Sequence, residues 1–190
     1  MTTPSREVIL FTSDWTGIVP AVNLVQQLSA WSLDARMLLL ADVERTCSRT
    51  ARAWPLIRIA CGWSRGIPGF RERYGSTYGS VVGLWTLWSA KWLVLARLVE
   101  RRANVLMLDS DMMVSTNPYP LLDCWPLRRF ALLVPPEGAR VNVGWIYARG
   151  ALSRTGGLPS VLWDMVRRLR LFLEQMLSPT QAPTPTLTEP

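Results

Sequence analysis

The sequence predicts an α/β fold in which a mostly parallel central sheet is flanked by helices. Short apolar runs alternate along the chain with longer segments that carry apolar residues three or four positions apart, an order typical of doubly wound sheets. The run at 105–108 is apolar throughout, as expected of a strand that is buried on both faces. We expect one domain over residues 1–177 and a disordered tail, rich in Thr and Pro, over residues 178–190.

The first part of the chain supplies three strands and two helices. Pro20 stands at a position that favours the first turn of a helix, and the segment 21–31 after it has apolar residues spaced by three. A second helical segment, 43–54, ends before Pro55. The predicted strands are the short apolar runs at 8–12, 36–41 and 56–60. Residues 61–80 break the pattern with many glycines and arginines, and we predict that they form a mobile flap over a substrate.

The second part begins and ends with a helix. Residues 84–102 form the first, and 158–177 form an amphipathic helix that packs on the sheet or on a partner. The predicted strands between them are 105–108, 112–115, 130–134 and 141–147. Gly144 lies inside the last of these, where a ligand or another backbone segment approaches closely.

Two carboxylates follow the most apolar strand. Asp109 and Asp111 stand one residue apart directly after residues 105–108. Ligands of open α/β sheets bind beyond the carboxyl ends of the strands, and two like charges so close together favour a cation beside them. The pattern therefore predicts a site for a metal ion and a phosphate group. The alternative is that both side chains lie in a solvated loop that caps the next turn.

Three further residues join this candidate site. Asp14 and Asp42 each follow a predicted strand, so they lie on the same rim as turn formers or as contacts for a ribose or a base. Lys91 is the one lysine of the chain, and helical geometry places it on the apolar side of its helix, away from most of the polar stripe. A buried ammonium group needs an anionic partner, which is a diphosphate or one of the two aspartates, unless the side chain reaches solvent from the helix edge.

Composition narrows the function. The net charge is +7, but 20 of the 21 basic residues are arginines scattered along the chain, so we expect an anionic small substrate and no nucleic acid. The absence of His excludes Ser-His and Cys-His catalysis and His-ligated zinc. The 3 Cys form no metal motif and allow at most one disulfide. Charged residues interrupt the longest apolar region, 81–99, so we expect no membrane span, and no targeting signal is visible.

An ordered set of motifs resembles the nucleotide-diphospho-sugar transferase family of GT-A glycosyltransferases, which includes plant and algal arabinosyltransferases and xylosyltransferases. The motifs are Lys91-Trp92 in a helix, then Asn-Val-Leu-Met-Leu-Asp-Ser-Asp-Met-Met-Val over 104–114, then Asn117-Pro118, then Asn-Val-Gly-Trp-Ile-Tyr over 142–147. Residues 9–15 and 39–47 resemble the first two strands of the family. The resemblance covers roughly residues 7–150.

The resemblance implies a GT-A fold and transfer of a sugar from a nucleotide-diphosphate donor to a glycan or glycoprotein acceptor, with the anomeric configuration retained. It implies that Asp111 binds Mn²⁺ or Mg²⁺, that Asp109 contacts the ribose or the metal, and that Lys91 supports the aspartates or phosphates. Asn142 and Gly144 would line the sugar pocket. The resemblance also implies the Golgi or the secretory pathway.

The chain departs from this family after Tyr147. GT-A enzymes usually supply a further metal ligand there, often a His, and this chain contains no His. The part of the domain that closes over acceptor and metal is short or missing, which indicates truncation at the carboxyl-terminal end. Two alternatives stay open: a catalytically inactive GT-A-like domain that binds a partner through the helix at 158–177, and a haloacid-dehalogenase-like phosphohydrolase with Asp109 as its nucleophile.

Overall fold

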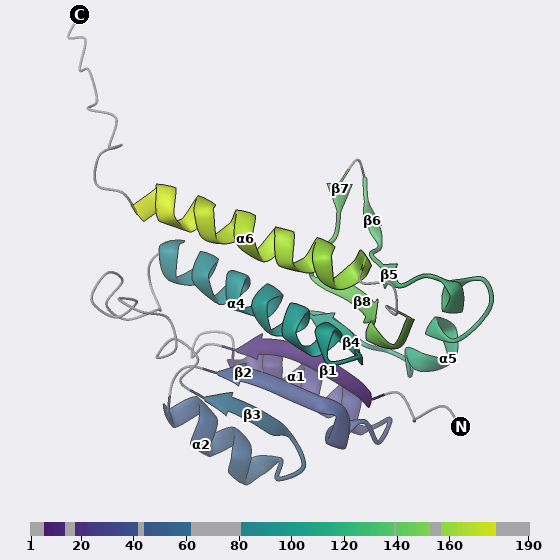
Figure 1. Ribbon diagram of the computed structural model, residues 1–190. Helices are drawn as coiled ribbons and strands as arrows, with labels where there is room; N and C mark the ends of the chain where they lie inside the picture. The colour runs from purple at the N-terminus through teal and green to yellow at the C-terminus, as the bar shows by residue number, and fades with distance from the viewer. Residues whose placement is uncertain are drawn as a thin grey trace, which may run out of the picture.

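The computed structural model describes residues 6–13, 18–41, 44–61, 81–138, 140–152 and 157–177 (Figure 1). The flap predicted at 61–80 lies outside these residues except for Cys61, and the tail predicted at 178–190 lies outside them entirely.

Six strands form the central sheet in the order β3-β2-β1-β4-β8-β5. Neighbours among β3, β2, β1 and β4 run parallel, whereas β8 runs antiparallel to both β4 and β5. The strands are β1 (Arg6–Ser13), β2 (Met37–Ala41), β3 (Arg58–Cys61), β4 (Ala103–Leu108), β5 (Leu132–Leu133) and β8 (Trp145–Arg149), and a separate hairpin pairs β6 (Pro136–Glu137) with β7 (Arg140–Val141). The mostly parallel α/β sheet predicted from the sequence is confirmed.

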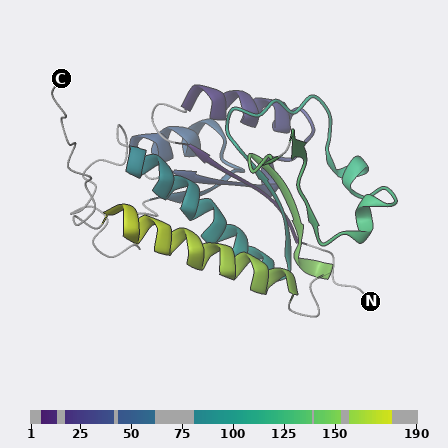
Figure 2. The same ribbon diagram turned by 90° about the horizontal axis from the view of Figure 1, so that it is seen from above.

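Helices cover both faces of the sheet (Figures 1 and 2). One face carries α4 (Val81–Glu100) and, packed on it, α6 (Gly157–Leu177); the other carries α1 (Ile18–Ser29) and α2 (Glu44–Ala53). Short helical turns complete the chain: α5 (Tyr119–Leu122), η1 (Asp34–Arg36), η3 (Leu127–Arg129) and η4 (Gly150–Leu152). Among the described helices, none is both long and apolar enough to cross a membrane.

The core lies on both faces of β4. Alternate side chains of a strand point to opposite faces, so Leu106 and Leu108 join the cluster beneath α1, while Val105 and Met107 join the cluster beneath α4. All six β4 residues are buried, which explains why the run at 105–108 is apolar without alternation. Leu162 of α6 is fully buried in the second cluster, so α6 packs on the domain, as one of the two sequence expectations had it.

Three strand boundaries differ from the sequence prediction. Residues 112–115 belong to no strand, and the Val114 N–H donates to the Gln27 side chain instead of to a neighbouring strand. The strand predicted at 130–134 shortens to two residues, because two prolines follow it. The strand predicted at 141–147 is divided by a turn that contains Gly144, which corrects the placement of that glycine inside a strand.

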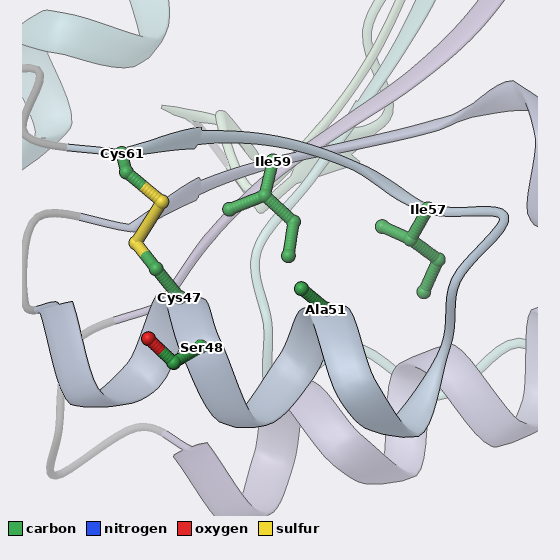
Figure 3. Close-up of a pocket in the computed structure, with 6 residues that line it drawn as sticks. All are labelled: Cys47, Ser48, Ala51, Ile57, Ile59 and Cys61. Atoms are coloured by element: carbon green, nitrogen blue, oxygen red, sulfur yellow. A yellow bond between two sulfur atoms is a disulfide. The ribbon is translucent and has the colours of Figure 1, made fainter.

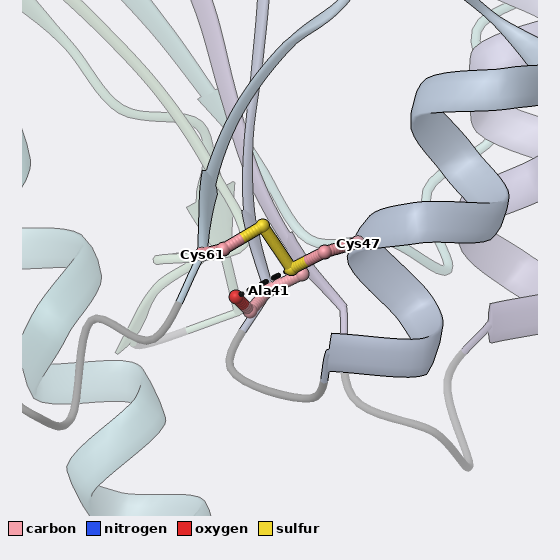
Figure 4. Close-up of a disulfide and its surroundings, with 3 residues drawn as sticks. All are labelled: Ala41, Cys47 and Cys61. Atoms are coloured by element: carbon pink, nitrogen blue, oxygen red, sulfur yellow. Dashed lines mark hydrogen bonds between the residues drawn. A yellow bond between two sulfur atoms is a disulfide. The ribbon is translucent and has the colours of Figure 1, made fainter.

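A disulfide joins α2 to the edge strand β3. Cys47 is buried and Cys61 is exposed, and their Cα atoms lie 6.1 Å apart (Figure 4). Cys47 Sγ lies 3.3 Å from the Ala41 carbonyl oxygen, which would accept a hydrogen bond from the reduced thiol, since a disulfide sulfur has no proton to donate. A hollow of about 400 Å³ lies beside the bridge (Figure 3). It is lined by Cys47, Ser48, Ala51, Ile57, Ile59 and Cys61.

A largely buried polar network lies at the amino end of β4, opposite the end where the disulfide lies. Arg149, at the end of β8, is 6% exposed and donates to the Leu122 carbonyl and, at 3.1 Å, to Asp123 Oδ1. Its guanidinium carbon stacks 4.7 Å from the centre of the Tyr147 ring. The Tyr147 hydroxyl donates to Glu7 Oε2 at 3.2 Å, and burial, with the nearby Glu7 charge, raises the pKa of this phenol. The network ties β1, β8 and α5 together.

We expect Cys61→Ser to lower the free energy of unfolding by about 3 kcal/mol, because the bridge closes a loop with a sequence separation of 14 residues. The substituted side chain is exposed, so no cavity is created. Urea unfolding with and without a reductant measures the effect, and the reductant should destabilise the wild type but not the variant. Cys124→Ser, at the exposed free cysteine, is the control and should leave stability unchanged.

Arg149→Met should cost about 2 kcal/mol of folding stability, because the Leu122 carbonyl loses its buried donor and the Tyr147 ring loses its stacked cation, whereas the Asp123 side chain is 65% exposed and returns to water. Arg167→Met is the matched control. Arg167 pairs with Asp164 on the surface with its side chain 65% exposed, and its loss should cost no more than about 0.5 kcal/mol. Equal costs in urea unfolding would contradict a structural role for the Arg149 network.

Candidate functional site

The site is built at the carboxyl end of β4, where β8 pairs beside it. Asp109 follows the last residue of β4, and its backbone N–H donates to the Gly144 carbonyl at 2.7 Å. This bond extends the pairing of Leu108 with Trp145 by one step. The backbone that carries the first aspartate is therefore fixed by the same two strands that form the core.

Helix α4 delivers Lys91 to this point. The chain turns back between α4 and β4 through Arg102, whose φ of 61° is the left-handed conformation common after helix ends. Lys91 stands nine residues before Glu100, or ~14 Å along the helix, and Asp109 stands six residues after Ala103, or ~20 Å along the strand. The long lysine side chain covers the remaining distance.

Lys91 is buried and ion-paired. It is 4% exposed, beside the buried Trp92, and its Nζ donates to Asp109 Oδ1. Lys91 therefore lies on the apolar side of its helix, as the sequence predicts, and its partner in this structure is Asp109, while its contact with a diphosphate stays a prediction. The Asp109 carboxylate remains 37% exposed, so one partner is in the core and the other reaches the surface.

Gly144 leaves room for the ion pair. A Cβ atom at this position would stand 2.6 Å from Asp109 Oδ2, closer than real contacts allow. The Gly144 N–H donates to Asn142 Oδ1 at 2.8 Å, which fixes the turn before β8. Asn142 and Gly144 thus lie together beside Asp109, as the sequence prediction of a shared pocket requires, although their contact with a sugar stays a prediction.

Asp111 is held differently. Its side chain is exposed, and a turn closed by the Met112 N–H donating to the Asp109 carbonyl at 3.1 Å separates it from the core. Three residues after Asp111, the Val114 N–H donates to Gln27 Oε1 of α1 at 2.6 Å. Sequence reasoning missed Gln27, because one glutamine within an amphipathic helix carries no signal of a contact 87 residues away.

Two predicted site residues and the hollow beside the disulfide are separate from the Lys91–Asp109 pair. Asp14 and Asp42, predicted to contact a ribose or a base, lie outside the described residues. The hollow between α2 and β3 is lined by none of the predicted site residues.

The carboxylates of Asp109 and Asp111 suit a metal ion that is also held by the phosphates of a substrate. Within the described part of the chain, no group of three or more His, Cys, Asp or Glu side chains could hold a metal ion. Mg²⁺ is usually held by one or two carboxylates together with the phosphates of a substrate, and Mn²⁺ accepts the same oxygen donors. Asp111, with the exposed edge of Asp109, fits this type of site, whereas a site made of protein ligands alone does not.

Comparisons with known proteins give a limited likeness. The chain matches no protein family and no curated protein. Its main chain resembles that of a glycosyltransferase. The crystal structure of glycosyltransferase GlyE from Streptococcus pneumoniae TIGR4 is 14% identical with a TM-score of 0.49, and the match covers 91% of this chain and 44% of that one. The apo-form of the same enzyme gives 14% identity, a TM-score of 0.47, and coverage of 86% and 39%. The chain thus spans less than half the length of these structures, and likeness at this level assigns no role to any residue.

Gly144→Ala should lower stability by about 2 kcal/mol, because the new methyl group displaces Asp109 from the buried Lys91. The same change should cost less in a Lys91→Met background, where no ion pair is left to break. A double-mutant cycle by urea unfolding measures this coupling. Gly157→Ala, at a helix position with nothing within 4 Å, is the control. Additive costs would show that Gly144 does not act through the ion pair.

Proposed function

We propose that this chain is a glycosyltransferase domain that binds a nucleotide-diphosphate sugar together with Mn²⁺ or Mg²⁺ and transfers the sugar to a glycan or glycoprotein. The observation that carries the proposal is the buried ion pair of Lys91 and Asp109 at the carboxyl end of β4, with the exposed Asp111 two residues beyond. A fixed cation, a partly exposed carboxylate and a free carboxylate at this position are what a metal-bound diphosphate needs.

The charges support this assignment. Lys91, Asp109 and Asp111 together carry a net charge of −1, so the site repels a diphosphate on its own. A divalent ion on Asp111 reverses the sign and makes the diphosphate favourable. We therefore infer that metal and nucleotide bind together, with Asp109 contacting the metal or the ribose and with Lys91 holding Asp109 in place.

The reaction requires little covalent chemistry from the protein. The bond between the anomeric carbon and the diphosphate oxygen breaks, and the diphosphate leaves with the electron pair. The oxygen of an acceptor hydroxyl forms the new bond to the anomeric carbon, and its proton passes to the departing diphosphate oxygen. The metal, when bound, neutralises the leaving diphosphate. Asn142 and Gly144, beside Asp109, would line the space for the sugar.

The disulfide supports a proposal about the compartment. Disulfides form and persist in oxidising compartments, and Cys47 with Cys61 forms one here. We propose that the protein acts in the secretory pathway, in agreement with the Golgi expected from the family resemblance.

Asp111→Ala should abolish metal-dependent nucleotide binding, because it removes the exposed carboxylate of the site. A thermal-shift screen with UDP, GDP, ADP and CDP in Mn²⁺ identifies the base, and calorimetry with the best nucleotide measures affinity. Asp164→Ala, which removes a carboxylate from the outer face of α6, is the control and should bind like the wild type. Unchanged affinity in Asp111→Ala would contradict the proposal.

The two alternative functions predict different results. A catalytically inactive binding domain would give no heat with any nucleotide sugar and Mn²⁺. A phosphohydrolase would release inorganic phosphate in a reaction that Asp109→Asn abolishes. Phosphate release of this kind would refute the transferase proposal and would make Asp109 the nucleophile of a phosphohydrolase.

A further inference from the structure

The segment that carries Asp111 is anchored by a side chain of α1, which lies on the face of the sheet opposite α4. From residue 111 to 115 exposure alternates, with Asp111, Met113 and Ser115 exposed and Met112 and Val114 half-buried. Such alternation is that of extended chain with one face on the protein. Val114 packs against the cluster beneath α1, so Met113, which is 86% exposed, points outward.

None of the described strands pairs with this segment, so its backbone needs another partner. The Val114 N–H finds that partner in Gln27 Oε1 of α1, at 2.6 Å. Gln27 is half-buried, and its neighbours Leu24 and Leu28 are fully buried beneath the sheet, which fixes the helix that presents the amide. The acidic motif is thus held from both layers: Lys91 of α4 holds Asp109, and Gln27 of α1 holds the chain just beyond Asp111.

We propose that Gln27 is a positioning residue for the metal and nucleotide site, acting on Asp111 through the backbone of residues 112–114. The inference rests on the proposed function. An exposed carboxylate on an unpaired loop would sample many positions, and each lost constraint lowers the fraction of molecules that present it correctly. Gln27 removes that freedom by fixing the loop three residues downstream.

Three variants separate this role from general stability. Gln27→Met keeps the length of the side chain but removes the oxygen acceptor. Gln27→Glu keeps an acceptor and should restore the bond. Gln26→Met, at the exposed neighbouring glutamine on the same helix, is the matched control.

Two measurements are made on each variant. Hydrogen exchange reports whether the Val114 amide and residues 111–115 become less protected. Calorimetry with Mn²⁺ and the nucleoside diphosphate that gives the largest wild-type thermal shift reports the affinity. We expect Gln27→Met to raise exchange in this segment and to weaken Mn²⁺-dependent nucleotide binding about fivefold, the effect of one net hydrogen bond. Gln27→Glu should recover both values, and Gln26→Met should change neither.

The outcomes distinguish the two proposals. No Mn²⁺-dependent nucleotide binding by the wild-type protein would refute the proposed function and the ligand-positioning role with it, while the exchange data would still decide whether Gln27 anchors the segment. Wild-type binding with unchanged affinity in Gln27→Met would refute the positioning role alone. Weakened binding that Gln27→Glu does not recover would also refute it, because the acceptor would not be the cause.

Discussion

A charged amine in the core requires an anion at one fixed place, and the arrangement of this site follows from that requirement. Lys91 is 4% exposed and can keep its charge there because Asp109 meets it. The pairing holds only if α4 packs antiparallel on β4, if β4 ends one residue before Asp109, and if the turn before β8 places no side chain against the carboxylate. Gly144 meets the last condition, because any Cβ at this position would displace the carboxylate.

The polar side chains at the two ends of the central strands are arranged differently. At the amino end of β4, Asn104 donates to Glu7 Oε1 at 2.7 Å and accepts from the Ala151 N–H at 3.2 Å, and the Arg149 network lies beside it. Most polar groups at that end bond to one another, although the buried Arg149 Nε and Tyr119 hydroxyl find no hydrogen-bond partner within the described residues. At the carboxyl end, one ion pair fixes the backbone while the carboxylates keep exposed area.

Much of this architecture could be predicted from the sequence, because the core strands are apolar on both faces and Pro20 and Pro55 mark helix boundaries. Lys91 could also be placed, since one lysine on an apolar helix side has few alternatives. Its partner could not be chosen, because a diphosphate and an aspartate satisfy the same charge. The turn at Gly144 was missed because the apolar run through it resembles one strand, and only the side chains of Asn142 and Asp109 divide it.

The contact between Gln27 and Val114 could not be predicted from sequence patterns. Periodicity assigns a helix face to the core or to solvent, but Gln27 lies at the boundary between the two, where a polar side chain has no preferred partner. Its role arises from tertiary structure: α1 ends where the segment after Asp111 crosses the same face of the sheet, and the unpaired N–H there needs an acceptor. A site assembled from opposite layers gains rigidity without a continuous motif, so its anchoring residues become visible only when the layers are seen together.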